Sequence, residues 1–341
     1  MTTIAFAVTN SQLVQERVAA AVWEGLTALP KRLPPWLFYD EAGSRLFDEI
    51  TERPEYYLTR TERAIFAAHA ERMIARAAET FLDETGRNEA TALRISELGA
   101  GSADKTRLLL AAAVARQQAV IYEPVDVSAS ALEAARERIE REFERVTVSP
   151  RVADYTHGLG LEPCAAQERR LVLYIGSSIG NFEPWEAAEL LERVCAELEP
   201  GDGLLLGVDL QKDEATLLTA YDDFAGVTAT FNLNVLARLN RELGAAFDLE
   251  AFAHRAVWNE AESRIEMHLE SRIAQTVRLE ALDLDVDFAA EESIHTENSY
   301  KYRPGQAEAL LEASGFSPVE SWTDERGWFV VCLARKAAAG V

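Results

Sequence analysis

Short apolar runs alternate with helical patterns along the middle of the chain. Five runs rich in Leu, Ile and Val predict strands, at residues 93–98, 119–122, 146–152, 171–175 and 204–210. Between these runs, apolar residues recur every three or four positions, as they do on the buried face of a helix. The run at 171–175 is almost entirely apolar, which is typical of a strand covered on both faces.

Two more apolar segments close this pattern. Residues 318–322 and 328–334 flank Asp324-Glu325-Arg326-Gly327 and predict an antiparallel hairpin. Five strands that alternate with helices, followed by such a hairpin, predict an α/β fold with the Rossmann-like sheet of class I methyltransferases. An all-parallel dehydrogenase sheet fits this order less well.

The period changes outside the central region. Residues 11–31 predict an amphipathic helix, and one helical stretch is expected from Tyr221 through Leu236. Residues 264–273 and 282–288 alternate apolar and polar side chains, as half-exposed antiparallel strands do. We therefore predict a second, α+β domain. The predicted ranges are 60–212 and 302–341 for a cofactor-binding methyltransferase domain, and 1–59 and 213–301 for a substrate-binding domain.

The first strand of the central region leads into a glycine turn. The sequence LRISELGAGSADKTRLLL, residues 93–110, predicts a strand, a turn and a helix that opens near Ser102 or Asp104. Gly99 and Gly101 lack a Cβ and can adopt positive φ, so a ligand can lie against their backbone. The helix start adds unpaired N–H groups. This outline predicts a cofactor loop, and a tight turn without a ligand is the alternative.

The residues around this turn favour a cationic cofactor. The third glycine of a dinucleotide-binding loop is missing, and its place is taken by Asp104, which would repel a pyrophosphate. Lys105-Thr106 follows no glycine pair with the spacing of a P-loop. Glu97 and Asp104 instead suit the sulfonium and ammonium groups of S-adenosylmethionine.

Asp126 is the predicted ribose ligand. It ends the second strand, where a doubly wound sheet presents a carboxylate to ribose hydroxyls. Glu123 is the rival at the same strand end. Either acid could instead cap the next helix, in which Ser130 and Glu133 have the spacing of a capping box. The small residues GSSIGNF, 176–182, follow the fourth strand and predict a place where a substrate approaches.

Composition limits the partners of the chain. Its 341 residues include 57 acidic and 34 basic ones, and a net charge of −23 argues against nucleic acid or an anionic membrane as a partner. No apolar run approaches the roughly 18 residues of a membrane span, and the N-terminus has no signal-peptide pattern. Three separated cysteines predict a reducing cytoplasm. No heptads are visible, so a monomer is expected, and the spacing of the five histidines predicts no metal site.

Several longer motifs follow one another along almost the whole chain. In order, they are LPPWLFYDEAGSRLFDEITERPEYYLTRTE, ELGAGSADKTRLLL, GSSIGNF, YDDFAGVTATFNLNVLARLNREL and RIEMHL. Together they resemble one known family, the histidine Nα-methyltransferases of ergothioneine biosynthesis. This resemblance implies an S-adenosylmethionine-dependent enzyme that methylates the α-amino group of free histidine three times, giving the betaine hercynine.

The resemblance also implies roles for individual residues. The implied cofactor contacts are Gly99, Lys105, Asp126, Asp154 and Tyr155, although the family usually has Phe in the place of Tyr155. The residues implied to hold the amine and carboxylate of histidine are Tyr56, Asn181 and Tyr221, with Tyr39 close by. Those implied to shape the imidazole pocket are Met267, Glu297 and Ser299. Tyr39 and Asn181 are the expected catalytic residues.

Physical arguments support two of these roles. The α-amine must lose its proton before it attacks, and oxygen acceptors at Asn181, Tyr39 and Tyr56 could orient its lone pair. If the chain is extended at 297–299, Glu297 and Ser299 lie on one face and can pair with the two imidazole nitrogens. Such polar pairing rejects a ligand that lacks the matching groups.

Three other functions stay open at this point. The chain could methylate another aromatic amino acid such as tryptophan. It could also bind S-adenosylmethionine without catalysis, or be a nicotinamide dehydrogenase on a similar sheet. Binding of S-adenosylhomocysteine without turnover would favour the second function, and binding of NAD the third.

Overall fold

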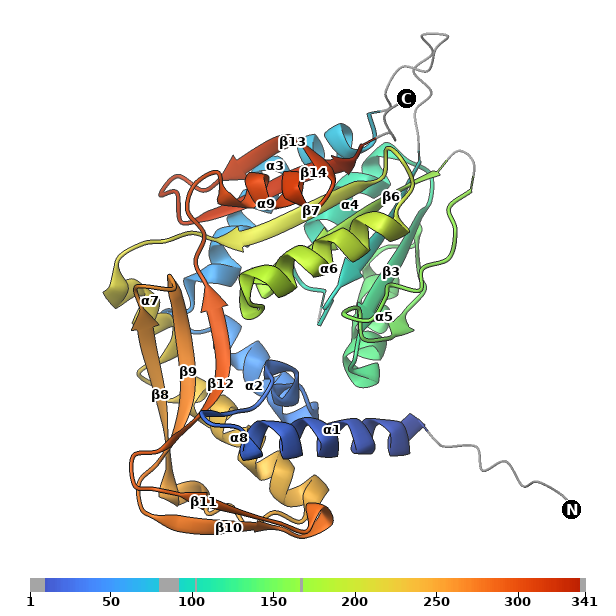
Figure 1. Ribbon diagram of the computed structural model, residues 1–341. Coiled ribbons are helices and arrows are strands. Elements are labelled where there is room, and N and C mark those ends of the chain that lie inside the picture. The colour runs from blue at the N-terminus through green and yellow to red at the C-terminus, as the bar shows by residue number, and fades with distance from the viewer. Residues whose placement is uncertain (1–9, 80–91, 102, 166–167, 338–341) are drawn as a thin grey trace, which may run out of the picture. The chain divides into compact units, whose positions relative to one another are not determined.

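The computed structural model describes residues 10–79, 92–101, 103–165 and 168–337. The chain divides into two compact units and passes from one to the other five times (Figure 1). Unit 1 comprises Met1–Ile50, Leu218–Asn259 and Ile265–Glu297, and unit 2 comprises Thr51–Leu217, Glu260–Arg264 and Asn298–Val341. Each unit is therefore built from three separate segments of the chain.

An eight-stranded sheet forms the centre of unit 2. Its order is β13-β14-β7-β6-β2-β3-β4, with β5 beside β3. The pairings of β14 with β13 and with β7 are antiparallel, and the other pairings in this sheet are parallel. The strands are β2 (Ala92–Leu98), β3 (Val120–Asp126), β4 (Val146–Val148), β5 (Arg151–Val152), β6 (Glu168–Tyr174), β7 (Gly203–Asp209), β13 (Phe316–Thr323) and β14 (Phe329–Lys336). This topology confirms the predicted sheet of class I methyltransferases and its closing hairpin.

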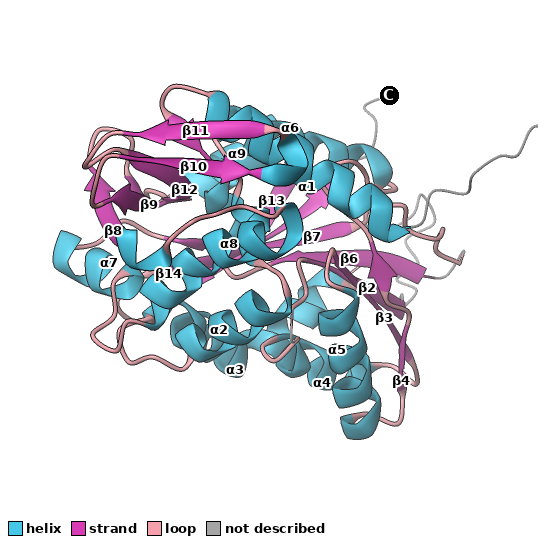
Figure 2. Cartoon of the chain, turned by 90° about the horizontal axis from the view of Figure 1, so that it is seen from below, coloured by secondary structure: helices cyan, strands magenta, loops and turns pink. Residues whose placement is uncertain are grey.

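Helices cover both faces of this sheet (Figures 1 and 2). Three of them pack on one face in a core that includes Phe66, Leu109 and Ile139. Two others pack on the opposite face around Leu191 and Leu311. The first group is α3 (Tyr57–Ala77), α4 (Thr106–Arg116) and α5 (Ala129–Glu142), and the second is α6 (Pro184–Glu197) and α9 (Gln306–Ala313). Every residue of β7 is buried, as expected for a strand covered on both faces.

β3 is longer than the sequence predicts, because it continues through a proline to Asp126. The carbonyls of Tyr122 and Asp126 both accept hydrogen bonds from the β4 and β5 side. By alternation, the nitrogen of Pro124 faces the same side. There it lies opposite Ser149-Pro150, which separates β4 from β5, so its missing N–H costs no ladder bond. Because Ser149-Pro150 interrupts the pairing with β3, the single strand predicted at 146–152 is divided into the two short strands β4 and β5.

Unit 1 combines a four-stranded sheet with helix α8 (Val227–Leu243). The sheet has the order β1-β12-β9-β8, and β10 and β11 form a separate antiparallel pair. The strands of the four-stranded sheet are β1 (Lys31–Arg32), β8 (Phe252–Asn259), β9 (Arg264–Ser271) and β12 (Ser293–Tyr300), and those of the separate pair are β10 (Gln275–Leu279) and β11 (Leu284–Phe288). The other helices of unit 1 are α1 (Asn10–Thr27) and α2 (Glu41–Thr51). Burial alternates along β9, which confirms the predicted half-exposed strand.

The single helix predicted from Tyr221 through Leu236 is wrong. The structure has two helices there, since α7 (Glu214–Tyr221) ends before α8 begins. Asp223 lies in the gap, and its carboxylate accepts the first two N–H groups of α8, at 3.1 and 2.7 Å. These donors have no partner inside the helix, so the aspartate fixes where α8 starts.

The unit boundaries differ from the predicted domain ranges. Unit 2 begins at Thr51 rather than at residue 60, and it resumes at Asn298 rather than at 302. One reason is that α3 starts at Tyr57, whose hydroxyl donates to Asp209 at the end of β7 (2.6 Å). Tyr56 and Ser299 consequently belong to unit 2. The division of labour between a cofactor domain and a substrate domain stays a prediction.

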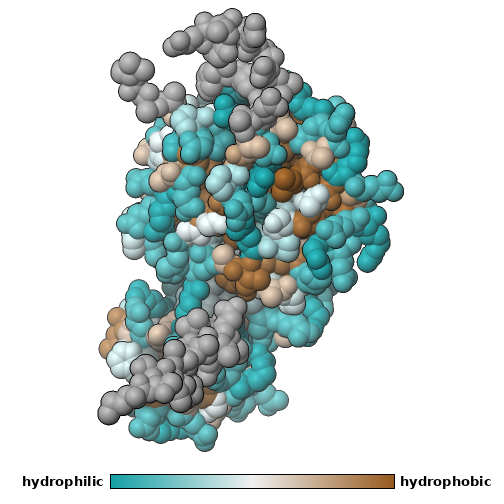
Figure 3. Space-filling view, turned by 90° about the vertical axis from the view of Figure 1, so that its right-hand side faces the viewer, coloured by the Kyte–Doolittle hydropathy of each residue, from teal (hydrophilic) through white to brown (hydrophobic). Residues whose placement is uncertain are grey.

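One face of the molecule is mostly polar. Figure 3 shows hydrophilic side chains over most of one face, with a few separate hydrophobic patches. This agrees with the large excess of acidic residues. Among the described helices, none is both long and apolar enough to cross a membrane.

Candidate active site

The glycine turn joins β2 to α4 and leaves its backbone accessible. Gly99 and Gly101 have φ values of +67° and +49°, a region that other residues rarely adopt. The Gly99 N–H donates to the carbonyl of Val125 near the end of β3 (2.8 Å). A Cβ built on Gly101 would meet no described atom within 4 Å. The turn is thus anchored at one end and has open space beside its second glycine.

Helix α4 begins at Thr106 with Lys105 as its N-cap, which is close to Asp104, one of the two predicted starts. Ser102 itself lies outside the described residues. Asp104 forms an ion pair with Arg63 and lies 3.6 Å from Arg107. Its carboxylate is therefore largely neutralised by two guanidinium groups, which weakens the argument that it attracts a cationic ligand.

Glu97 lies on the buried side of the same turn. Its carboxylate accepts hydrogen bonds from the hydroxyls of Thr106 (2.7 and 2.8 Å) and Tyr122. Burial raises the pKa of Glu97 to about 7, although these hydroxyls and Lys105 act in the opposite direction. Its protein partners give Glu97 a role in shaping the turn.

Asp126 connects the end of β3 to the glycine turn. Its Oδ2 accepts the N–H of Gly101 (3.1 Å) and its Oδ1 accepts the N–H of Ser128 (2.9 Å). Burial raises the pKa of Asp126, against the lowering effect of these two N–H groups. Each oxygen has a second lone pair, so the carboxylate can still accept from ligand hydroxyls. The capping box predicted at Ser130 and Glu133 is wrong, because Ser128 caps α5 instead.

Glu123, the rival of Asp126, has a structural role. It is 1% exposed and forms ion pairs with Arg170, Arg94 and Arg151. Its Oε2 also accepts from the hydroxyl of Ser96 (2.9 Å). A carboxylate enclosed by three guanidinium groups is unavailable to a ribose, so Asp126 is the acid of this strand that fits the predicted ligand role.

Lys105 makes an ion pair that the sequence analysis missed. Its ammonium group binds Glu62 of α3, which is fully buried. The Glu62 carboxylate also accepts the N–H of Gly176 at 2.9 and 3.0 Å. A Cβ on Gly207 would lie only 2.2 Å from Glu62 Oε1, so glycine makes room for the acid. The signal in the sequence is an acid at helical spacing among the apolar residues of α3, such as Ile65.

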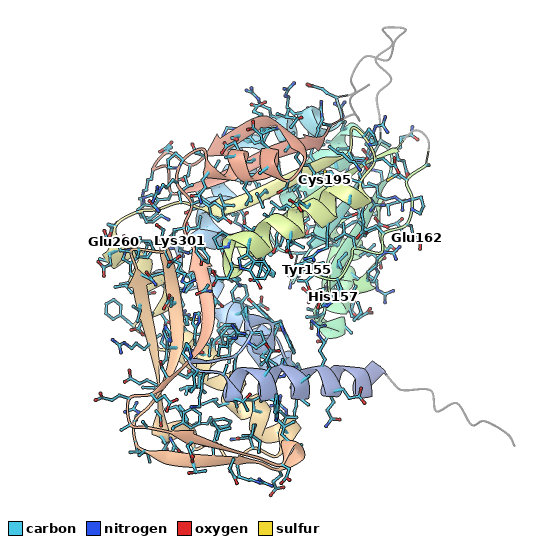
Figure 4. All side chains as sticks on the ribbon, in the orientation of Figure 1. Tyr155, His157, Glu162, Cys195, Glu260 and Lys301 are labelled. Atoms are coloured by element: carbon cyan, nitrogen blue, oxygen red, sulfur yellow. The ribbon has the colours of Figure 1, made fainter. Side chains whose placement is uncertain are left out.

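Asp154 and Tyr155 follow β5, and Figure 4 labels Tyr155 in this loop. Asp154 accepts from the backbone N–H and the hydroxyl of Thr156, at 2.9 and 2.6 Å. The ring of Tyr155 approaches the glycine turn, with its Cε1 and Oη 3.7 Å from a Cβ built on Gly99. Burial raises the pKa of Tyr155 to about 12, so its ring stays uncharged. An aromatic face beside the turn suits the adenine ring of the predicted cofactor, S-adenosylmethionine.

A second polar cluster lies at the end of β7, and the sequence predicted no role for its members Tyr57, Asp209, Lys212 and Lys301. Asp209 accepts from the Tyr57 hydroxyl (2.6 Å) and from Lys212 (2.7 Å), and Lys301 lies 3.0 Å away. Lys301 also donates to the Ser299 hydroxyl (2.8 Å). Burial lowers the pKa of Lys212 to about 8. Figure 4 labels Lys301 directly after β12.

Two predicted substrate residues of unit 2 lie at the starts and ends of its elements. Asn181 ends the short helix Ser178–Asn181, which lies within the segment GSSIGNF after β6. Tyr56 precedes α3, and it is 9% exposed. Ser299 is 3% exposed and is held by Lys301. All three belong to the same unit as the glycine turn.

The other predicted substrate residues belong to unit 1. The Tyr39 ring packs edge-on against Phe47 (5.7 Å between centroids) and Phe231 (5.9 Å). Three further members are largely buried, at 5%, 2% and 9% exposure, and they are Tyr221, Met267 and Glu297. The Tyr221 carbonyl accepts from His254 (2.8 Å), and the Met267 carbonyl from Thr296 (3.0 Å).

Strand order and glycine turn together define a class I methyltransferase. The turn fits S-adenosylmethionine for three reasons. No described atom fills the space beside Gly101, and the carboxylate of Asp126 has lone pairs that can accept further hydrogen bonds. The uncharged ring of Tyr155 offers an aromatic face. The chain belongs to the family of histidine-specific, S-adenosylmethionine-dependent methyltransferases, whose family model matches residues 18–336.

Individual relatives agree with this family. The Histidine N-alpha-methyltransferase of Mycolicibacterium smegmatis is 47% identical over 320 residues, which is 94% of this chain and 95% of the relative. Ergothioneine biosynthesis protein 1 of Neurospora crassa is 31% identical over 90% of this chain and 34% of its own length. The 4-dimethylallyltryptophan N-methyltransferase of Claviceps purpurea is 26% identical, over 93% and 94%.

Proposed function

We propose that this enzyme transfers methyl groups from S-adenosylmethionine to the α-amino group of free L-histidine. Three transfers would give hercynine, and this trimethylation would be the first step of ergothioneine biosynthesis. The observation that carries the proposal is the 47% identity to a Histidine N-alpha-methyltransferase over 94% of the chain. A relative named for ergothioneine biosynthesis supports the pathway.

Strand β12 supports recognition of the imidazole side chain. Glu297 and Ser299 both lie in this strand, so their side chains alternate to the same face. Glu297 is 9% and Ser299 3% exposed, which gives a ligand there little competing water. A carboxylate can accept one ring N–H, and a hydroxyl can bond the second nitrogen. An amino acid without ring nitrogens would form neither of these two hydrogen bonds and would bind more weakly.

Methyl transfer requires an unprotonated amine in line with the methyl group. The bound cofactor supplies an electrophilic methyl group on a sulfonium. We assign Asn181, Tyr39 and Tyr56 to the orientation of the amine, since amide and phenol oxygens accept its N–H groups and direct the lone pair. Tyr221 would bind the amino acid beside them. Asp126 and Tyr155 would hold the ribose and adenine, and Lys105 and Asp154 would complete the cofactor site.

Product analysis tests this function. Purified protein is incubated with S-adenosylmethionine and one free amino acid at a time, and products are weighed by mass spectrometry. We expect histidine to gain one, two and finally three methyl groups. Absence of any mass gain on histidine would refute the proposal. Calorimetry with S-adenosylhomocysteine then separates an inactive protein that binds the cofactor from one that does not.

A second candidate substrate is an indole amino acid. The relative from Claviceps purpurea, named as a 4-dimethylallyltryptophan N-methyltransferase, favours it, but at 26% identity. The variant Glu297→Ala discriminates the two. If histidine is the substrate, this variant loses histidine turnover, because one ring N–H loses its acceptor. Unchanged histidine turnover would show that Glu297 does not contact the ring.

We further propose that the enzyme acts as a cytoplasmic monomer without nucleic acid or membrane partners. The support is the charge of −23 and the separation of the three cysteines. Size-exclusion chromatography with light scattering checks the monomer directly, and a mass of two chains would contradict it.

A further inference from the structure

Three side chains with metal-binding atoms converge on one sheet of unit 1. Glu266 and His268 lie two positions apart on β9, and His295 lies on the neighbouring strand β12. One ligand atom from each of them lies within 4.8 Å of the others. The sequence gives no sign of this group, because its members come from two strands that meet only in the fold.

The distances suit a shared cation. Glu266 Oε2 and His268 Nε2 are 3.1 Å apart, and the rings of His268 and His295 stack with centroids 4.9 Å apart. Two ligands of one tetrahedral Zn²⁺, each about 2.0–2.1 Å from the metal, lie roughly 3.3 Å from one another. Small rotations of these side chains would therefore be enough to bring their ligand atoms around one ion.

Two of the ligands are already oriented by the groups behind them. Asn259 donates to Glu266 Oε1 (2.9 Å), which leaves Oε2 directed at His268. His295 Nε2 lies 3.0 Å from the carbonyl oxygen of Glu297. When that nitrogen carries the proton, it donates to the carbonyl, and Nδ1 is the nitrogen that can bind a metal. Hydrogen bonds of this kind behind the ligands are typical of metal sites in proteins.

The ring of His268 offers Nε2 as its ligand atom, because this nitrogen faces Glu266. The other ring nitrogen, Nδ1, is buried and makes no hydrogen bond among the described residues. A small rotation of the ring toward an ion would therefore break no described hydrogen bond at Nδ1. The side chains of His268 and Glu266 are 17% and 15% exposed, so an ion could enter while its ligands stay mostly shielded from water.

We propose that Glu266, His268 and His295 bind one divalent transition-metal ion of the Zn²⁺ class. Two imidazoles and one carboxylate form a nitrogen-rich set that prefers Zn²⁺, Ni²⁺ or Cu²⁺ to Mg²⁺ or Ca²⁺. The ion would link β9 to β12 two residues before Glu297. It would therefore stabilise the strand that carries the imidazole-binding carboxylate proposed above.

Equilibrium dialysis tests this site without using enzyme activity. Full-length protein without a histidine tag is stripped with a chelator, dialysed against Zn²⁺ alone and analysed by elemental mass spectrometry. We expect one tightly bound Zn²⁺ per chain. The variants His268→Ala and His295→Ala should each weaken binding at least tenfold, and Glu266→Gln by a similar factor. His69→Ala serves as the matched control, because His69 lies on α3 in unit 2.

Each outcome decides the matter. No tight Zn²⁺ on wild-type protein refutes the site. Equal binding by wild type and all three ligand variants places the ion elsewhere and also refutes it. Because a variant could lose metal by unfolding, thermal melting is recorded with and without Zn²⁺. Zn²⁺ should raise the melting temperature of wild type and His69→Ala clearly more than that of folded Glu266→Gln. Methyl transfer is not measured, so the outcome is independent of the histidine substrate.

Discussion

Two strands of unit 2 end in an aspartate, and the two aspartates differ in the groups that bond to them. At the end of β3, the described partners of Asp126 are backbone N–H groups, from Gly101 and Ser128. At the end of β7, Asp209 is fully buried and bonded by the side chains of Tyr57, Lys212 and Lys301. Both acids lie at the carboxyl ends of parallel strands of one sheet, where ligands usually bind.

The difference teaches how to separate a ligand site from a structural cluster. Backbone donors position Asp126 without neutralising its charge, and its lone pairs remain able to accept from a ribose. Cationic partners neutralise Asp209, so its charge is used to hold α3, β7 and the residues after β12 together. We therefore expect changes at Asp209 to reduce stability and changes at Asp126 to reduce cofactor affinity.

The largest expected effect is loss of Asp209. Asp209→Ala leaves two buried lysines without their counter-charge, which should lower the free energy of unfolding by about 3–5 kcal/mol. Urea denaturation followed by circular dichroism measures it. Asp285→Ala, on the exposed side of β11, is the control and should change stability by less than about 0.5 kcal/mol. A loss below about 1 kcal/mol for Asp209→Ala would show that the cluster is not structural.

Glu97 provides a pH-dependent version of the same contrast. Its hydrogen-bond partners are hydroxyls rather than cations, and burial raises its pKa from the ordinary value of 4.5 to about 7. A carboxyl with a raised folded-state pKa stabilises the protein below its unfolded pKa, and this stabilisation is lost as pH rises through about 7. Between pH values of about 4.5 and 7, the free energy of unfolding of wild-type protein should therefore fall relative to that of Glu97→Gln. The expected slope is up to about 1.4 kcal/mol per pH unit. Denaturation curves at several pH values measure this difference, and parallel curves would contradict it.

Asp126 should show the reverse of Asp209. Asp126→Ala removes the acceptor of the ribose hydroxyls and should weaken S-adenosylhomocysteine binding by about 1–3 kcal/mol, with a smaller effect on unfolding. Isothermal titration calorimetry measures the affinity. Glu123→Gln is the matched comparison on the same strand, and it should lower stability but keep cofactor affinity. Wild-type affinity in Asp126→Ala would mean that this acid only orders the turn.

The smallest effect concerns Tyr155. Tyr155→Phe keeps the aromatic face and should change cofactor affinity by less than about 0.5 kcal/mol, whereas Tyr155→Ala should cost about 0.5–1.5 kcal/mol. The same calorimetric titration compares them. A large loss in the phenylalanine variant would assign the hydroxyl, rather than the ring, to the ligand.

The strands of unit 2 were the part of the fold most accessible from sequence. Buried runs such as 171–175 leave a continuous apolar signal, and the hairpin after α9 has its own turn residues. The predicted ends of helices and strands were wrong where a single residue has more influence than the periodic pattern. Asp223 interrupts an otherwise helical stretch by capping α8, and Pro124 stays inside β3 because the neighbouring strand is broken opposite it.

The candidate site was predictable only where one segment carries the whole signal. The glycine turn with Asp126 belongs to a strand, turn and helix pattern that can be recognised locally. Glu62 was missed because its partners, Lys105 and Gly176, come from separate loops. The group of Glu266, His268 and His295 was missed for the same reason. Sequence spacing reveals neither kind of long-range pairing.

Strand β12 runs without a break across the boundary between the units, with residues up to Glu297 in unit 1 and from Asn298 onward in unit 2. A gene fragment cut at this boundary would split a hydrogen-bonded strand rather than a flexible linker. Neither unit can therefore be excised as one continuous piece. Chimaeras with relatives of different substrate preference would have to exchange β12 as a whole, together with the strands beside it.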